Sequence, residues 1–394
     1  MTADESSLRR WPLPVLGLVL TLVALGWTVV VGYLAHLANT LDVTDFQVYR
    51  EAVGFWLGGG DLYQYLMVLP DGRLLPFTYP PFAAITMVPT TWLPLTMGWL
   101  VCVVVQLGCL LALAAVVARR TGLLAGLGRP EAITLVGAGW LGLAASEPAL
   151  HGISLGQVSL ILIAVVVLDA VVVPPRWRGV LTGVAAAIKL TPGIFLLYFL
   201  LTRQWRAAAN AAIAGAVATG IGFAVLPGPS WRYWTSLLFE ASRVGEPDVT
   251  RNKSLLGLLS HLGMAGPGRT ALWLVLAAAV AVIGLWQARR SQRAGAALAA
   301  VITVGLVSTV ISPVSWPHHL VWLPLAGLYL AFCSGWRRWL AVLLLLGFLA
   351  GTPLLSYRSD LPPGLAVAGD VVAVLLLIGS VLGIPGRRGG EVDG

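Results

Sequence analysis

Two charged residues in apolar surroundings are the first candidates for chemistry in this sequence. Lys189 lies in the middle of the apolar segment 178–203, close before a proline. A cation at membrane depth costs on the order of 3 kcal/mol, so we expect a negative partner: Asp370, Glu147 or the phosphate of a ligand. Asp45 follows the first long apolar run. A carboxylate at a membrane surface can act as a general base when burial raises its pKa, and the alternative for Asp45 is a helix cap.

A second group of residues is typical of a carbohydrate-binding surface. Glu147, His151 and Gln157 lie with several glycines in one short segment between two apolar runs. A loop of this polarity faces water or protein, so we take these residues as candidates for sugar contacts. Tyr49 and Tyr79 belong to aromatic stretches after the first apolar run and are candidates for the same role. An aromatic belt at the membrane interface is the structural alternative for the tyrosines.

A third group suits the binding of an anion. Arg251, Asn252 and Lys253 place two cations and an amide together ahead of an apolar stretch, which favours phosphate binding; the alternative is snorkelling at the interface. His318 and His319 are adjacent, and two adjacent side chains cannot both face one metal ion from a helix. One of the two is better suited to bind a phosphate or hydroxyl. We therefore expect no metal ion, no cofactor and a metal-independent reaction.

The composition requires these residues to be positioned by membrane helices. The 394 residues are 58% hydrophobic and only 11% charged, with a mean hydropathy of +0.86. A soluble domain has about 25% charged residues, so a soluble, disordered or nucleic-acid-binding protein is excluded despite the net charge of +8. The apolar runs are continuous rather than alternating, which excludes a β-barrel. The chain is therefore predicted to be an all-α polytopic membrane protein with roughly ten to twelve helices.

Ten apolar runs are long enough to be full spans, and one further segment is anomalous. The expected spans are 11–37, 93–118, 131–147, 155–174, 206–227, 269–288, 295–313, 317–334, 336–354 and 363–384. The segment 178–203 contains Lys189 and Pro192 and has basic residues at both ends. We predict that it forms a re-entrant pair of half-helices, since non-helical backbone at membrane depth is tolerated where it lines a cavity.

With this hairpin, the basic residues sort cleanly between the two sides of the membrane. Sixteen of the 25 basic residues fall in short loops on one side, eight fall on the other, and Lys189 remains at depth. The positive-inside rule assigns the richer side to the cytoplasm. The prediction is a multi-pass protein of the plasma membrane, with both termini cytoplasmic.

Two long loops then lie on the outer, periplasmic side of a single integral-membrane domain comprising residues 1–394. The first loop, 38–92, is predicted to begin with an interfacial amphipathic helix, because Phe46, Tyr49 and Val53 recur at helical spacing. The second loop covers 228–268. Function concentrates in long loops, so we expect an enzyme or a receptor that works at the outer leaflet.

The motifs together resemble glycosyltransferase family 87, whose members are integral-membrane enzymes of the GT-C superfamily. The resemblance covers residues 40 to 325, in the family's order. The stretches that carry it are Thr-Asp-Phe-Gln-Val-Tyr-Arg-Glu-Ala from 44, Gly-Gly-Asp-Leu-Tyr from 59, Phe-Thr-Tyr-Pro-Pro-Phe from 77, Gly-Gln-Val-Ser-Leu from 156, Gly-Val-Ala-Ala-Ala-Ile-Lys-Leu-Thr-Pro from 183, Asn-Lys-Ser-Leu-Leu-Gly from 252 and Ser-Pro-Val-Ser-Trp-Pro-His-His from 312.

The resemblance implies an activity and a role for several residues. Known relatives are α-(1→2)-mannosyltransferases that take mannose from polyprenyl-phosphate-mannose and build phosphatidylinositol mannosides, lipomannan or lipoarabinomannan. By position, Asp45 matches the general base that deprotonates the acceptor hydroxyl. Lys189 and one of His318 and His319 look like ligands of the donor phosphate, and Arg251 or Lys253 could share that task. The partners implied are the donor lipid, a mannosylated glycolipid acceptor and membrane lipids, without nucleic acid.

Two other functions stay open. Within the same fold, the donor could be polyprenyl-phospho-arabinofuranose, because motifs do not separate a furanose pocket from a pyranose pocket. From a different class, the chain could be a transporter of lipid-linked sugars. A transporter explains the spans and the buried lysine, but it does not explain two long asymmetric outer loops or an acid at the membrane surface.

Overall fold

The computed structural model describes residues 43–70, 72–240 and 251–331, together with the single residues 243, 245, 249, 337, 339–341, 344, 371, 378 and 379. The predicted span 11–37 lies outside the described residues, as do the predicted spans 336–354 and 363–384 apart from those single positions. Asp370, one of the three partners considered for Lys189, also lies outside them.

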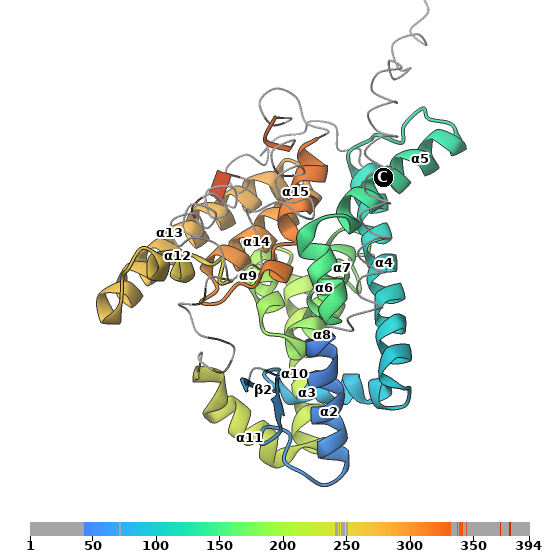
Figure 1. The fold of residues 1–394 in the computed structure, drawn as a ribbon. Coiled ribbons are helices and arrows are strands. Elements are labelled where there is room, and N and C mark those ends of the chain that lie inside the picture. Colours follow the sequence, from blue (N-terminus) through green and yellow to red (C-terminus); the bar gives the residue numbers. More distant parts are fainter. Residues whose placement is uncertain are drawn as a thin grey trace, which may run out of the picture.

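The described chain is almost entirely helical, with one short hairpin of strands (Figure 1). The elements in chain order are α2 (Thr44–Leu57), β1 (Leu66–Val68), β2 (Leu74–Pro76), α3 (Pro81–Met87), η2 (Val88–Thr91), α4 (Leu95–Arg120), α5 (Arg129–Ala144), α6 (Glu147–Leu155), α7 (Ser159–Val171), α8 (Val180–Ile188), η3 (Thr191–Gly193), α9 (Ile194–Leu201), α10 (Trp205–Val225), α11 (Pro227–Thr235), η4 (Leu237–Phe239), α12 (Leu255–His261), α13 (Gly266–Arg293), α14 (Ala297–Ile311), η6 (Pro317–His319) and α15 (Trp322–Leu330).

The helical class is confirmed, whereas the count of ten spans is not. Among the described residues, three helices are long and apolar enough to cross a membrane, namely α4, α10 and α13. Helices α6 and α7 together form a fourth candidate, but the chain bends by 117° between them. The predicted span 295–313 is the 15-residue helix α14. Polar and proline-containing breaks around Gln157 and Pro313 shorten these helices relative to the apolar runs.

The segment predicted to form a hairpin folds back on itself. Helices α8 and α9 have nine and eight residues, or about 14 Å and 12 Å of rise, and neither is long enough to cross about 30 Å of hydrocarbon. The two outer ends of the pair lie together, because Arg178 Nη1 donates to Gln204 Oε1 over 3.1 Å. Lys189 and Pro192 therefore lie at the tip, as expected for a re-entrant pair.

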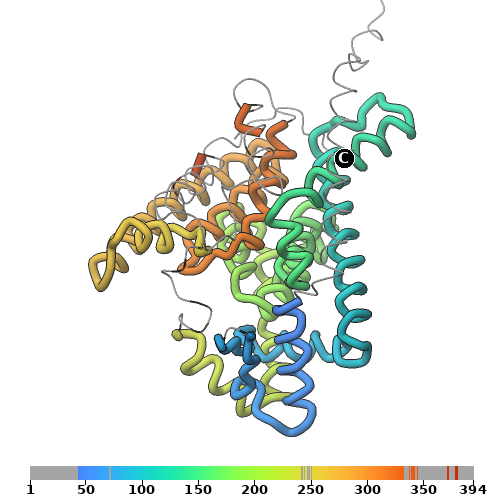
Figure 2. Tube along the Cα trace, viewed as in Figure 1, coloured from blue at the N-terminus to red at the C-terminus, as the bar shows by residue number. Residues whose placement is uncertain are grey.

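The basic ends of the long helices gather at one end of the molecule. Arg120, at the end of α4, donates to the carbonyl of Val171 at the end of α7. Tyr198 near the end of α9 donates to Gln292 near the end of α13 over 2.7 Å. Helices α2, α3 and α11, which belong to the two predicted outer loops, lie at the opposite end (Figure 1 and Figure 2).

Helix α14 forms the centre of the bundle. Its residues from Leu298 to Val310 are almost all buried, and α7, α9, α13 and α15 pack around it. A helix that is apolar on all sides is expected to be covered on all sides, which explains the even hydrophobicity of its sequence. The C-terminal end of α14 and the loop after it then lie next to the tip of the α8–α9 hairpin.

Small residues set how closely α8 packs against α10. A Cβ on Gly183 would lie 2.2 Å from the carbonyl oxygen of Ala211 and 2.8 Å from the amide nitrogen of Gly215. Such close backbone contact is typical of small-residue interfaces between membrane helices. At the N-terminal end of α8, next to Gly183, Asp169 on α7 accepts the N–H groups of Gly179 and Thr182 over 2.9 and 3.0 Å. Together these contacts place the C-terminus of α8, and with it Lys189.

Replacing Gly183 by valine should therefore destabilise the protein. The new side chain overlaps the α10 backbone, which cannot move out of the way as a flexible side chain can, and overpacking of this kind costs about 1–3 kcal/mol. We expect a fall of several degrees in the thermal unfolding midpoint of the purified protein. Gly220→Val on α10 is the matched control, because a Cβ at Gly220 meets nothing within 4 Å. Equal midpoints for the two variants would contradict this account of the α8–α10 interface.

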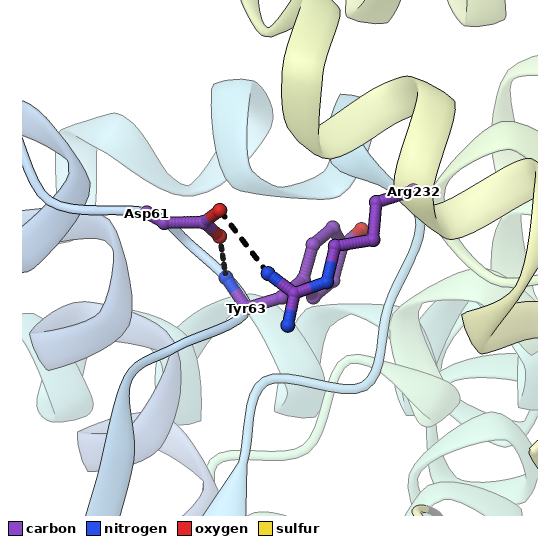
Figure 3. Close-up of polar contacts among 3 residues, drawn as sticks. All are labelled: Asp61, Tyr63 and Arg232. Atoms are coloured by element: carbon purple, nitrogen blue, oxygen red, sulfur yellow. Dashed lines mark hydrogen bonds and ion pairs between the residues drawn. The ribbon is translucent and has the colours of Figure 1, made fainter.

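The predicted outer loops contain regular structure. The expected amphipathic helix is α2, and its buried side includes Phe46, Tyr49 and Val53. The β1–β2 hairpin, antiparallel with Met67 opposite Leu75, was not predicted. The turn after α2 is joined to α11 by Asp61, which accepts from the Tyr63 N–H over 2.9 Å and pairs with Arg232 over 3.2 Å (Figure 3).

Candidate active site

Asp45 lies in the first turn of α2, inside the helix rather than ahead of it. Helix α2 begins at Thr44, and the residue before it, Val43, makes no side-chain cap. The interpretation of Asp45 as a capping residue is therefore wrong. Its carboxylate accepts a hydrogen bond from Gln157 Nε2, which comes from the turn between α6 and α7. A carboxylate in the first helical turn is also favoured by the helix dipole.

A continuous chain of hydrogen bonds joins Asp45 to Lys189. Gln157, whose Nε2 contacts Asp45, accepts at Oε1 from the hydroxyl groups of Tyr79 and Ser159, each over 3.2 Å. Lys189 Nζ donates to Ser159 Oγ over 2.7 Å and lies 3.5 Å from the Tyr79 hydroxyl. Each proton along this chain is donated toward Asp45, so the chain is consistent with an ionised carboxylate there.

Tyr79 remains a proton donor in this arrangement. Burial first, and then the negative charge of Asp45, raises the pKa of its phenol above the usual value. The ring of Tyr49 meets that of Tyr79 edge to face, with centroids 5.3 Å apart, and the two hydroxyl groups lie 2.9 Å apart. Since Tyr79 donates to Gln157, Tyr49 donates to Tyr79. Both tyrosines predicted to be at the site are therefore joined to Asp45 through Gln157.

Lys189 lies at the tip of the hairpin and faces polar groups from three other elements. Besides Ser159 and Tyr79, its Nζ atom lies 3.0 Å from Nε2 of His319, and Asp45 attracts its positive charge. Glu147, one of the partners considered for Lys189, interacts electrostatically with Lys253. These contacts place Lys189 in polar surroundings, while its role and a phosphate ligand remain proposals.

The hydrogen bonds of His319 place its proton beside Lys189. The backbone N–H of Trp316 donates to His319 Nδ1 over 3.2 Å, so the ring proton belongs on Nε2. Two donors, His319 Nε2–H and the Lys189 ammonium, then face each other 3.0 Å apart. This contact is relieved when one acceptor bridges the two donors from the side, and an oxyanion is the acceptor that both would bind best.

His318 points away from this site, which separates the roles of the two adjacent histidines. Its ring stacks on His151, with centroids 5.5 Å apart and planes inclined by 6°, and is nearly perpendicular to the ring of His319. Both ring nitrogens of His318 are buried without a hydrogen-bond partner among the described residues. His151, His318 and His319 thus form a row that connects Lys189 with the segment containing Glu147.

The residues of the segment 251–253, which were predicted to bind an anion, lie beside this row. Arg251 interacts electrostatically with His151, and Lys253 is buried with 5% of its surface exposed. Asn252 joins two loops: its Nδ2 donates to the Pro313 carbonyl over 3.0 Å, and its Oδ1 accepts from the Ser315 N–H over 2.9 Å. This places Asn252 as a support for the loop that carries the histidines.

Ser159 is a site residue that the sequence analysis did not identify. Its hydroxyl is the link between Lys189 and Gln157. The sequence did contain a signal for Ser159, because it lies two residues after the candidate Gln157 in the Gly-Gln-Val-Ser stretch. The contact of the Trp316 backbone N–H could not be predicted in this way, because almost every residue type has a backbone N–H.

The fold is that of a helical membrane protein, and in its site the Asp45 carboxylate is joined to Lys189 through buried polar groups. Comparison with known proteins gives its family. A sequence model described as glycosyltransferase family 87 matches residues 77–313. The chain belongs to this family, and it is accordingly a glycosyltransferase. No solved structure matches the chain.

Curated relatives resemble most of the chain. A polyprenol-phosphate-mannose-dependent alpha-(1-2)-phosphatidylinositol mannoside mannosyltransferase of Mycobacterium tuberculosis is 36% identical over 85% of this chain and 81% of its own length. An enzyme of the same description from Mycolicibacterium smegmatis is 33% identical over 71% of this chain and 67% of its own length. A polyprenol-phosphate-mannose-dependent alpha-(1-2)-phosphatidylinositol pentamannoside mannosyltransferase of Mycolicibacterium smegmatis is 35% identical over 88% of this chain and 83% of its own length.

The contact between Gln157 and Asp45 predicts a change in pH dependence. Gln157→Glu places a second carboxylate beside Asp45, and the repulsion raises the pKa of Asp45. A general base must be deprotonated, so the acidic limb of the kcat/KM profile should move upward by about one pH unit. Gln157→Leu also removes the hydrogen bond that favours the ionised carboxylate, so it should lower kcat with a smaller upward shift, because it adds no charge. An unchanged acidic limb in Gln157→Glu would show that Asp45 is not the titrating base.

Proposed function

We propose that this chain is an α-(1→2)-mannosyltransferase that moves mannose from polyprenyl-phosphate-mannose to a mannosylated phosphatidylinositol. The relatives named above support the donor, the acceptor class and the linkage. The single observation that carries the proposal is the convergence of Lys189 and His319 on one point, with Asp45 connected to them through Gln157 and Ser159. A base and a pair of oxyanion donors are the two parts that this transfer needs.

The proposed mechanism is a single displacement with inversion. Asp45 removes the proton of the acceptor hydroxyl while that oxygen attacks the anomeric carbon from the face opposite the phosphate. The bond between the anomeric carbon and the phosphate oxygen breaks, and both electrons leave with the polyprenyl phosphate. Lys189 and His319 Nε2–H stabilise the charge that develops on this oxygen. A β-linked donor gives an α-linked product without a covalent intermediate, and metal-independent transfer stays a prediction.

The remaining candidate residues are assigned by where they lie relative to Asp45 and to the pair of Lys189 and His319. Tyr49 and Tyr79, which are joined to Asp45 through Gln157, would contact the acceptor or donor sugar. Glu147 and His151 lie beyond His318 and would contact sugar hydroxyls, with Arg251 and Lys253 nearby as further anion ligands. Asn252 and Gln157 would hold their neighbours in position, since their amides already contact protein groups.

The side of the membrane is also part of the proposal. The end of the molecule that gathers the arginines is assigned to the cytoplasm by the positive-inside rule. The site lies toward the opposite end, close to α2 and the outer loops. Transfer would then take place at the outer face of the plasma membrane, with both termini cytoplasmic. A growing lipomannan or lipoarabinomannan is the alternative acceptor, because it presents mannose hydroxyls at the same face.

The test is a comparison of donors with the purified protein in lipid nanodiscs. Radiolabelled polyprenyl-phosphate-mannose and polyprenyl-phospho-arabinofuranose are supplied separately with a phosphatidylinositol mannoside acceptor. We expect a mannosylated product and at most a trace of arabinosylated product. A product formed only from the arabinofuranose donor would overturn the mannose assignment. In proteoliposomes, movement of labelled donor between leaflets without any product would favour the transporter instead.

A further inference from the structure

Two large aromatic side chains lie exposed in the second predicted outer loop. Trp231 on α11 is 67% exposed, and Phe239, at the end of the short helix η4, is 76% exposed. Aromatic side chains of this size each bury about 150–250 Å² when they are covered, so leaving both in water is costly. Tyr233, also on α11, is buried against residues of the first predicted outer loop. One side of α11 therefore packs on the protein, and Trp231 faces away from it.

Helix α10 fixes where α11 lies relative to the bilayer. It comprises the 21 residues Trp205–Val225 and rises about 30 Å, which matches the thickness of the hydrocarbon core. Between its ends, Ile213, Val217 and Ile221 are exposed and face lipid. Only Leu226 separates α10 from α11, and Figure 1 shows α11 leading away sideways at the lower end of the molecule. Helix α11 therefore begins where the hydrocarbon ends.

Exposed tryptophans occur at both ends of the spanning helices. Trp205 begins α10 at the arginine-rich end of the molecule, and Trp92 precedes α4 at the opposite end, where α11 also lies. Tryptophan gathers at the two interfaces of a membrane, because its ring is apolar and its N–H is polar. Trp92 and Trp231 thus occupy the same interface from two different helices. This pattern assigns Trp231 to the headgroup region of the leaflet next to the predicted outer loops.

Helix α11 also supports the part of the first outer loop that leads to the site. Arg232 pairs with Asp61 (Figure 3), and the ring of Tyr233 stacks on that of Tyr63 with centroids 5.7 Å apart. The Tyr63 hydroxyl donates to the carbonyl oxygen of Tyr79 over 2.8 Å. Tyr79 is one of the two tyrosines joined to the carboxylate of the site. A single residue, Tyr63, therefore connects α11 with the site.

We propose that α11 anchors the outer loops to the membrane surface: Trp231, and Phe239 after it, insert among the phospholipid headgroups, while the opposite side of α11 holds Tyr63 and, through it, Tyr79. Lipid covers α11 because its exposed surface continues that of α10. Trp231 lies six positions after Val225, the exposed last residue of α10, so a bilayer that covers Val225 extends to Trp231. The anchor is independent of which sugar the enzyme transfers.

The test measures the depth of a spin label on α11 while Trp231 is kept. Thr235 is exposed one turn after Trp231, on the same side of the helix. Thr235→Cys therefore carries the label, in a full chain whose three cysteines are replaced by alanine. In nanodiscs of phosphatidylcholine and phosphatidylglycerol, accessibility to oxygen, which concentrates in lipid, is compared with accessibility to a water-soluble nickel complex. We expect a ratio of oxygen to nickel accessibility at least threefold above that of the label free in water.

Two further variants show whether the tryptophan is the anchor. Trp231→Gln should lower the ratio at the Thr235→Cys label at least twofold and should quicken amide hydrogen exchange in residues 61–66 at least threefold, because α11 no longer holds them. Trp177→Gln is the matched control, since it removes an indole of similar exposure, 60%, from the loop before α8 at the opposite end of the molecule. It should change neither quantity.

Three results would overturn the inference. The first is a ratio at the Thr235→Cys label equal to that in water, and the second is an equal effect of Trp231→Gln and Trp177→Gln. The third is low accessibility to both reagents together with spin–spin coupling between labels, which would show that a second copy of the chain covers α11 instead of lipid. No sugar is transferred in these measurements, so a failure of the proposed function leaves their outcome unchanged.

Discussion

Asp45→Asn is expected to lower kcat by about 10²–10⁴-fold, the contribution typical of a general base. The amide keeps the size of the side chain, and its oxygen can still accept the hydrogen bond from Gln157 Nε2. What is lost is the ability to take the proton of the acceptor hydroxyl. Initial rates at varied donor concentration should therefore show a collapse of kcat with the donor KM within about twofold of wild type.

Asp61→Asn is the matched control for this prediction. It is the same substitution in the same predicted outer loop, at a partly exposed ion pair with Arg232. Ion pairs of this kind contribute at most about 1 kcal/mol, so its rate should stay close to that of wild type. A turnover of Asp45→Asn equal to that of the Asp61 control would show that another group is the base.

Lys189→Met should cause the second large loss. Methionine keeps much of the length and apolar character of the side chain but removes the charge and the donors. Loss of one preorganised donor to a developing oxyanion costs about 10²–10³-fold in kcat. Because Lys189 is assigned to the phosphate, the KM of the donor should rise while the KM of the acceptor changes little. Equal effects on the two substrates would indicate a purely structural lysine.

The chain offers a direct comparison, because it contains only one other lysine. Lys253 is also buried, but it lies near Glu147 rather than beside His319. Lys253→Met should therefore reduce turnover less than Lys189→Met and should leave the donor KM closer to wild type. Thermal unfolding midpoints of both variants separate this effect from misfolding. A larger rise of the donor KM in Lys253→Met than in Lys189→Met would indicate that the phosphate binds at the second predicted outer loop.

The sequence predicted the helical class, helix α2 and the reversal of the chain around Lys189. These features depend on strong local signals, namely apolar periodicity, a costly buried charge and prolines that break helices. The span count was less predictable. The run 155–174 reads as a full span, but its helix α7 is only the 13 residues Ser159–Val171. The glycine and glutamine at the start of the run lie in a bend of 117° between α6 and α7.

The pairing of site residues could not be predicted, because it depends on contacts distant in sequence. Gln157 reaches Asp45 across 112 positions, and Lys189 reaches His319 across 130. The sequence also left the choice between His318 and His319 open, whereas in the structure Trp316 N–H donates to His319 Nδ1 and His319 Nε2 lies beside Lys189. The close packing of Gly183 on α10 was likewise invisible, because a glycine in an apolar run is compatible with many roles.

Linkage analysis of the product tests the central claim most directly. The purified chain in nanodiscs is given polyprenyl-phosphate-mannose, labelled in the sugar, and a phosphatidylinositol mannoside, and the glycolipid product is analysed for the position and configuration of the new bond. We expect one added mannose, α-linked to the 2-hydroxyl of an acceptor mannose, and loss of this product in Asp45→Asn. Absence of labelled glycolipid from active, folded wild-type protein, or a β-linked product, would contradict it.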